Sequence, residues 1–196
     1  SLSVDEIWDD PDLAGEPGED VWSQGPETMD SGPRFNVAPS QAVPVVTDKS
    51  PDKLVLLKWG LVPFWAKDPK IGYRMLNARS ESLAEKPAFR DAFERRRCIV
   101  LADGFYEWRR EGKGKAAKKT PYYIQSEAGG LMTFAGLWAS WKSKDDPDQR
   151  IISCTIVTRD AIGAVADIHD RMPVVLSKEA RAQWLRPDAE ADALKT

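Results

Sequence analysis

The chain has 196 residues, of which 42% are apolar and 30% are charged, and its formal net charge is -3. A chain of this length can bury one core, so the composition excludes general disorder and favours a single domain. No apolar run approaches the roughly 18 to 20 residues that span a bilayer, and no basic stretch followed by an apolar run resembles a secretory signal. We therefore expect a cytoplasmic protein without membrane contact.

The first part of the chain is an acidic lead-in, which we place at residues 1–33. Residues 1–30 contain ten Asp or Glu residues and no Lys or Arg, and residues 9–33 are rich in Asp, Glu, Gly and Pro, which indicates weak order. The remaining 166 residues contain 28 basic and 21 acidic residues, a balance of +7. A basic body favours a polyanionic partner. Charge alone leaves open an ordinary solvated surface beside a flexible acidic segment.

After the lead-in, short runs rich in β-forming residues are separated by polar, Gly- and Pro-containing segments. The run at residues 97–110 contains Gly104, which predicts a bulge or a bend there. Residues 111–119 are basic and contain glycine, as expected of a hairpin loop. The predicted strands lie at residues 42–46, 53–62, 97–110, 121–125, 131–141 and 151–158.

Only two segments have helical composition. Residues 81–97 predict one or two short helices broken at Pro87, and residues 177–185 predict a short helix with Ser177 as its N-cap. The sequence therefore predicts an α+β fold: one β-rich domain with a few short helices. We find no repeat and no internal linker.

The chain offers little for a metal or for thiol chemistry. Cys98 and Cys154 lie inside apolar runs, which favours small buried hydrophobes over reactive thiols. With two cysteines and one histidine, no convincing zinc constellation can be assembled. We expect neither a metal nor a cofactor.

An aromatic segment at residues 59–67 contains Trp59, Phe64 and Trp65 and ends in Lys67. Aromatic rings beside positive charge can stack on bases while the charge holds phosphate. The alternative is that such rings belong to the core, and for Trp59 we favour the core.

Four polar residues stand out as candidates for chemistry. Asn77 and Arg79 are spaced so that both point to one face if the segment is extended. Glu107 lies among aromatic residues, which would raise the pKa of its carboxyl group and suit acid or base catalysis; a surface or ion-paired role is the alternative. His169, the only histidine, could be catalytic or structural.

The order of eight sequence blocks resembles the SOS-response-associated peptidase (SRAP) family, from about Arg34 to about Trp184. The blocks are RFNVAPSQAVPVV, WGLVPFWAKD, NARSES, RCIVLADGFYEW, TPYYI, FAGLW, TIVT and DIHDRMPVVL. The resemblance implies a barrel-like β-rich fold with mixed and antiparallel sheets around a basic cleft. It also implies a sensor of abasic sites in single-stranded DNA, associated with the nucleoid when bound to damage.

In this family the attacking group is an N-terminal cysteine, which is also implicated in self-cleavage of the leader. An α-amine with a pKa of about 7.7 to 8.0 is partly unprotonated near neutrality and can condense with the sugar aldehyde. The thiol then closes the imine into a thiazolidine. The resemblance assigns positioning of the amine to Asn77, proton transfer to Glu107, and sugar-ring opening and proton transfer to His169. Asp167 or Asp170 would orient the imidazole.

The resemblance also assigns DNA contacts. It suggests that Arg79 and Arg171 hold the phosphates that flank the lesion, with Thr158 assisting. It places Pro39 and Trp65 where apolar surface packs against the neighbouring bases.

One departure concerns the nucleophile. The family's Met-Cys-Gly-Arg opening does not precede RFNVAPS here, and no cysteine comes before Cys98, which offers no free α-amine. We expect a SRAP domain over residues 34–196, shortened at the C-terminus and monomeric, that does not form the crosslink as printed. The alternative is a non-catalytic single-stranded-DNA-binding module that has lost its nucleophile.

Overall fold

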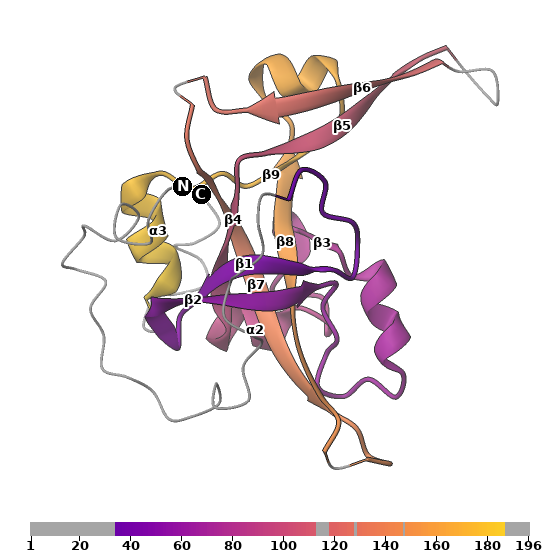
Figure 1. Cartoon of the computed structure of the whole chain (residues 1–196), viewed down its shortest axis with the longest axis vertical. Coiled ribbons are helices and arrows are strands. Elements are labelled where there is room, and N and C mark those ends of the chain that lie inside the picture. The colour runs from indigo at the N-terminus through magenta and orange to yellow at the C-terminus, as the bar shows by residue number, and fades with distance from the viewer. Residues whose placement is uncertain (1–33, 113–117, 128, 147, 187–196) are drawn as a thin grey trace.

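The computed structural model describes residues 34–112, 118–127, 129–146 and 148–186. The acidic lead-in and the centre of the predicted basic loop, residues 113–117, lie outside the described residues. Short helices sit against a strongly bent sheet, as Figure 1 shows. The strands are β1 (Ala42–Thr47), β2 (Ser50–Trp59), β3 (Asn77–Arg79), β4 (Arg97–Ala102), β5 (Gly104–Glu111), β6 (Lys118–Gln125), β7 (Met132–Lys142), β8 (Arg150–Asp160) and β9 (Arg171–Pro173).

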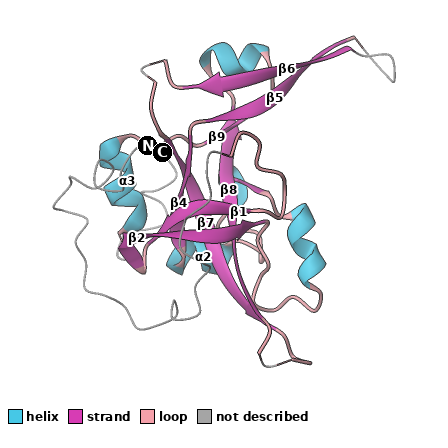
Figure 2. Ribbon diagram, in the orientation of Figure 1, coloured by secondary structure: helices cyan, strands magenta, loops and turns pink. Residues whose placement is uncertain are grey.

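Five strands close into a barrel. They pair in the order β2-β1-β4-β7-β8, with antiparallel neighbours, and the end of β2 pairs parallel with β8 to complete the ring. The closing pairs are Lys58 with Ser153 and Trp59 with Cys154. Figure 2 shows how the strands wrap around one another. The β-rich α+β fold with barrel-like mixed sheets is therefore confirmed.

A glycine ends the closing strand. Gly60 follows β2 with a φ of 121°, a conformation that side chains rarely adopt, and its N–H donates to the Cys154 carbonyl at 2.8 Å. A Cβ atom at this position would lie 2.6 Å from the carbonyl oxygen of Gly72. Only glycine allows the chain to leave the barrel here at this close approach.

The core has two main layers. Inside the barrel lie Val45, Leu57, Cys98, Trp138 and Cys154, all buried. Both cysteines are free and buried, which confirms their prediction as buried hydrophobes. A second cluster packs outside the sheet under α2 (Arg90–Arg95) and α3 (Lys178–Leu185).

Arg97 joins the ends of these two helices. Its side chain is 1% exposed, and its guanidinium donates to the carbonyls of Phe93 and Glu94 at 2.9 and 3.2 Å and to that of Trp184 at 2.7 Å. A further bond goes to the Arg186 carbonyl. The C-terminal carbonyls of a helix lack partners within the helix. Arg97 satisfies two of them in α2 and one in α3.

The predicted helices are present in shorter form. Residues 81–97 contain the end of a 3₁₀ turn at Ser80–Ser82 and then α2, on either side of Pro87. Ser177 caps α3, because its hydroxyl oxygen accepts from the Ala180 N–H at 3.2 Å. Within the described part of the chain, no helix is long and apolar enough to cross a membrane.

The run at residues 97–110 differs from the prediction of one long strand. It bends at Gly104 as expected, but β4 belongs to the barrel and β5 forms a separate two-stranded sheet with β6. A Cβ atom on Gly104 would lie 2.4 Å from the Ile124 carbonyl oxygen and 2.7 Å from the Tyr123 ring. Glycine therefore lets β6 pack closely against the start of β5 within the hairpin.

Candidate functional site

The hairpin brings Glu107 to His169. Glu107 lies on β5, and His169 lies between the 3₁₀ helix Gly163–Asp167 and β9. The Glu107 Oε2 and His169 Nε2 atoms are 4.0 Å apart. This exceeds a direct hydrogen bond, but catalytic contacts often tighten only when substrate is bound. At this separation one polar atom beside the pair could form a hydrogen bond with each of the two side chains.

The other nitrogen of His169 has partners for both protonation states. Its Nδ1 atom can accept the Arg171 backbone N–H at 3.0 Å, which leaves the proton on Nε2 toward Glu107. When protonated, Nδ1 can donate to the Asp170 carboxylate, 3.2 Å away, or to the Arg171 carbonyl at 3.1 Å. Of the two predicted orienting acids, Asp170 therefore contacts the imidazole. An imidazole supported in either state can both give and take a proton.

The surroundings of Glu107 suit acid or base chemistry. Partial burial raises the pKa of its carboxyl group, while His169 and the backbone N–H of Trp108 oppose the rise. The cause is the loss of water around a charged carboxylate on the partly buried face of the hairpin. A carboxyl group with a raised pKa next to a histidine is a typical acid-base arrangement.

Asn77 and Arg79 share one face of β3, as predicted. Both are exposed while Ala78 between them is fully buried, so the small side chain lets this short strand lie flat on the core. Asn77 pairs with Ile156 and Arg79 with Thr158 of β8. Thr158 also pairs with Pro173 of β9. The strand that carries Asn77 and the strand that follows His169 therefore both adjoin Thr158.

Arg171 is surrounded by acceptors. Its guanidinium donates to both Glu81 carboxylate oxygens, at 2.7 and 2.9 Å, to the Thr158 carbonyl at 2.8 Å, and to the Asp160 carboxylate. The sequence reasoning missed Glu81 and Asp160. Glu81 stands inside the NARSES block, only two residues after Arg79, but no spacing signal connects either acid to Arg171.

The remaining predicted DNA-contact residues differ in exposure. Pro39 is exposed and Trp65 is 45% exposed, so both side chains are available to a ligand. Thr158 is only 8% exposed. Trp59 is partly buried against the barrel core, and its indole N–H donates to the Leu76 carbonyl at 2.9 Å, which confirms the core interpretation.

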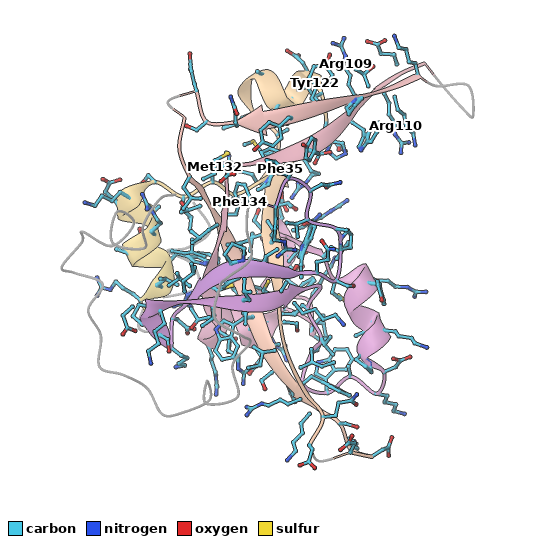
Figure 3. All side chains as sticks on the ribbon, in the orientation of Figure 1. Phe35, Arg109, Arg110, Tyr122, Met132 and Phe134 are labelled. Carbon is cyan, nitrogen blue, oxygen red and sulfur yellow. The ribbon has the colours of Figure 1, made fainter. Side chains whose placement is uncertain are left out.

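A cleft of about 580 Å³ lies between the end of the barrel and the hairpin. Its floor includes Phe134 and Ile156, and its walls include Phe35, Tyr106 and Tyr123. Figure 3 shows Phe35 near Phe134, on the side of the hairpin opposite to Tyr122. Because Ile156 pairs with Asn77, the cleft adjoins the strand that carries the predicted positioning amide. Among the described residues, no group of three His, Cys, Asp or Glu side chains could hold a metal.

Comparisons with known proteins show the family of the chain. A model of the family described as SOS response associated peptidase (SRAP) matches residues 11–196. The chain is 45% identical over 156 residues to "Abasic site processing protein YoqW" of Bacillus subtilis (strain 168), which covers 79% of this chain and 67% of that protein. It is 33% identical over 184 residues to "Abasic site processing protein HMCES" of Xenopus tropicalis, covering 78% of this chain.

The alignment covers 53% of the Xenopus protein, so the chain spans about half the length of that relative. Among solved structures, a protein from Bacteroides thetaiotaomicron is 31% identical with a TM-score of 0.70. That match covers 80% of this chain and 67% of the other.

Proposed function

Because the chain belongs to the SOS response associated peptidase family, we propose that it recognises abasic sites in single-stranded DNA and takes part in their covalent capture. The observation that carries the proposal is the Glu107–His169 pair, whose facing atoms are 4.0 Å apart. Two relatives are named abasic site processing proteins, which supports the same substrate.

Each step of the proposed reaction needs a proton to move. An abasic sugar reacts as its ring-opened aldehyde, and His169 protonates the ring oxygen as the ring opens. Asn77 positions an α-amine, which condenses with the aldehyde and releases one water to form an imine. Glu107 and His169 carry the protons of this condensation. Addition of a thiol across the C=N bond then closes a thiazolidine ring without a further leaving group.

The family resemblance assigns the nucleophile to an N-terminal cysteine, and neither printed cysteine suits that role. Cys98 and Cys154 are fully buried inside the barrel, and burial raises the pKa of both thiols. A buried thiol is a poor nucleophile and carries no free α-amine. We propose that a Met-Cys-Gly-Arg start, as in the family, supplies the amine and the thiol after Met removal. The same cysteine would carry out the associated peptidase reaction.

The family resemblance assigns the DNA contacts, and exposure supports those of Arg79, Trp65 and Pro39. Arg79 is exposed beside Asn77 and would bind a phosphate that flanks the lesion. Arg171 would bind a second phosphate. Thr158 would assist, since it lies on β8 between the strand that carries Arg79 and the strand that carries Arg171. Trp65 and Pro39 would pack against neighbouring bases, since aromatic and apolar surfaces stack on bases of any sequence.

The test is a denaturing gel of protein incubated with single-stranded DNA that contains one abasic site. We expect no heat-stable shifted band for the chain as printed, and a band when a Met-Cys-Gly-Arg start is placed before it at the family's position. A Cys-to-Ala change in that start is the matched control and should abolish the band. An equally stable band from the printed chain would show that the N-terminal cysteine mechanism is wrong.

The burial of both cysteines also favours a second candidate, a non-catalytic module that binds single-stranded DNA. Under this alternative the native protein has no Met-Cys start. Mapping the native translation start therefore separates the two candidates, because a Met-Cys directly upstream supports the catalytic one.

A further inference from the structure

The guanidinium of Arg171 has almost no donor left for a ligand. Its side chain is 17% exposed, both Nη atoms bind Glu81, and each has a second acceptor, Asp160 for Nη1 and the Thr158 carbonyl for Nη2. The Nε atom is buried and has no hydrogen-bond partner among the described residues. A phosphate that approaches Arg171 must therefore replace one of these acceptors.

Charge leads to the same requirement. Arg171 carries one positive charge, whereas Glu81 and Asp160 together carry two negative charges. Like charges disfavour a further anion at such short range. A phosphate can bind strongly here only if one carboxylate leaves the guanidinium.

The two carboxylates are not equivalent. Glu81 binds through both oxygens, a fork-to-fork geometry that is stronger and more directional than a single bond. The hydrogen bond from Arg171 lowers the pKa of Glu81 to about 2, so this carboxylate stays ionised. Asp160 contacts only Nη1, and its side chain is 86% exposed. Water can solvate Asp160 as soon as it moves away, so its ion pair is the weaker one.

We propose that Asp160 is an intramolecular stand-in for a DNA phosphate, which the phosphate displaces from Arg171, and that Glu81 is the permanent partner that keeps Arg171 in place. This inference rests on the proposed function, because it describes how the site admits the DNA backbone. Asp160 then acts as a weak competitor that discriminates against ligands without a backbone phosphate at this point.

Glu81 also reaches the catalytic histidine through Arg171. The backbone N–H of Arg171 donates to His169 Nδ1 at 3.0 Å. Fixing the position of Arg171 therefore also keeps this hydrogen bond, in which Nδ1 is the acceptor. Glu81 is therefore a positioning residue for His169, 88 positions away in the chain. Displacement of Asp160 would leave this arrangement intact.

The first test compares Asp160→Asn with Asp145→Asn. Both changes remove one negative charge, but Asp145 is exposed in the connection from β7 to β8, which lies in Figure 1 at the opposite end of β8 from β9. Affinity for a fluorescent single-stranded oligonucleotide without a lesion is measured by anisotropy. We expect Asp160→Asn to bind about two- to fivefold more tightly than Asp145→Asn, as expected for losing one exposed ion pair. Equal affinities overturn the inference.

The second test uses the imidazole resonances of His169, which need no assignment because the chain has one histidine. Glu81→Gln should shift these resonances and bring no gain in affinity, whereas Asp160→Asn should leave them in place. The reverse pattern, tighter binding for Glu81→Gln and shifted resonances for Asp160→Asn, overturns the assignment of the two acids. If neither the unaltered chain nor Asp160→Asn binds the oligonucleotide, the proposed function fails and this inference with it.

Discussion

The carboxyl group of Glu107 is partly removed from water, and this makes the stability of the fold depend on pH. Burial raises its folded-state pKa above the ordinary value of 4.5. The folded state therefore holds this proton more tightly than the unfolded state. The protonated Glu107 carboxyl group therefore adds to the free energy of unfolding below pH 4.5, and this contribution is lost as the pH rises through the folded-state pKa.

Replacing Glu107 with Gln should therefore stabilise the protein at neutral pH. The amide keeps an oxygen to accept the Trp108 backbone N–H but cannot ionise, so the cost of the buried charge disappears. Thermal unfolding at pH 7 should show a higher Tm for Glu107→Gln than for the unaltered chain, and the difference should vanish in acid. Glu111→Gln, on the same strand and half exposed, is the matched control. A lower Tm at pH 7 would contradict this account.

His169 should control the rate of capture more than the affinity for DNA. In a chain with the Met-Cys-Gly-Arg start, His169→Ala should slow adduct formation by about 10²- to 10⁴-fold, because a positioned proton donor is lost. The rate is read from quenched time points on a denaturing gel, and the affinity from anisotropy with lesion-free DNA. Asp167→Ala serves as the control, since Asp167 has no contact with the imidazole among the described interactions. Unchanged kinetics in His169→Ala would remove it from the mechanism.

At the level of elements, the turn between β2 and the 3₁₀ helix Pro69–Arg74 determines whether the barrel can close. Gly60 combines a positive φ with a close approach to the Gly72 carbonyl, and its N–H bonds to β8. The neighbouring Trp59 and Lys58 form the only parallel closure between β2 and β8 in the described residues. Local backbone strain here would therefore act directly on the closing pair.

Gly60→Ala should lower the free energy of unfolding by about 2 kcal/mol or more, because a strained φ and a backbone clash add together. Gly129→Ala is the control: its φ of 72° is also positive, but a Cβ atom there would have no neighbour within 4 Å. It should cost about 1 kcal/mol, the conformational strain alone. Urea unfolding of both variants measures the difference. Equal losses would show that the contact with Gly72 is unimportant.

For the whole molecule, the distribution of charge matters more than its sum. The net charge is -3, but the chain after residue 30 has a surplus of basic residues. Arg79 adds exposed positive charge two residues after Asn77, beside the strand that carries Thr158. A polyanion can therefore bind one face of a protein that is acidic overall.

Single-stranded DNA should bind more tightly than duplex, because its unpaired bases can pack against Trp65 and Pro39. The affinity should fall as salt rises, because bound phosphates release counterions. Arg79→Ala should weaken binding and reduce the slope of log K against log salt by about one unit, the loss of one phosphate contact. Lys144→Ala, exposed on the distant β7–β8 connection, should leave the slope unchanged. Equal affinities for single strand and duplex, independent of salt, would rule out the proposed binding of single-stranded DNA.

The sequence by itself determined the local features of this protein. Apolar runs rich in β-forming residues predicted the longer strands but not the short β3 and β9. Pro87 predicted the break between short helices, and Ser177 predicted the N-cap of α3. The spacing of Asn77 and Arg79 predicted their shared face. These features depend on residues a few positions apart, whose side-chain direction is set by the period of a strand or a helix. The family blocks supplied the candidate residues.

Only the tertiary structure decided which of these elements meet. The run at residues 97–110 reads as one strand, yet it divides at Gly104 into β4 of the barrel and β5 of the hairpin, where a Cβ atom would meet Ile124 and Tyr123 of β6. That fold brings Glu107 to His169, 62 positions later. It is also the packing of β8 against β3 and β9 that encloses Arg171 with Glu81 and Asp160. Contacts between distant residues depend on strand order and sheet closure, which no local pattern contains.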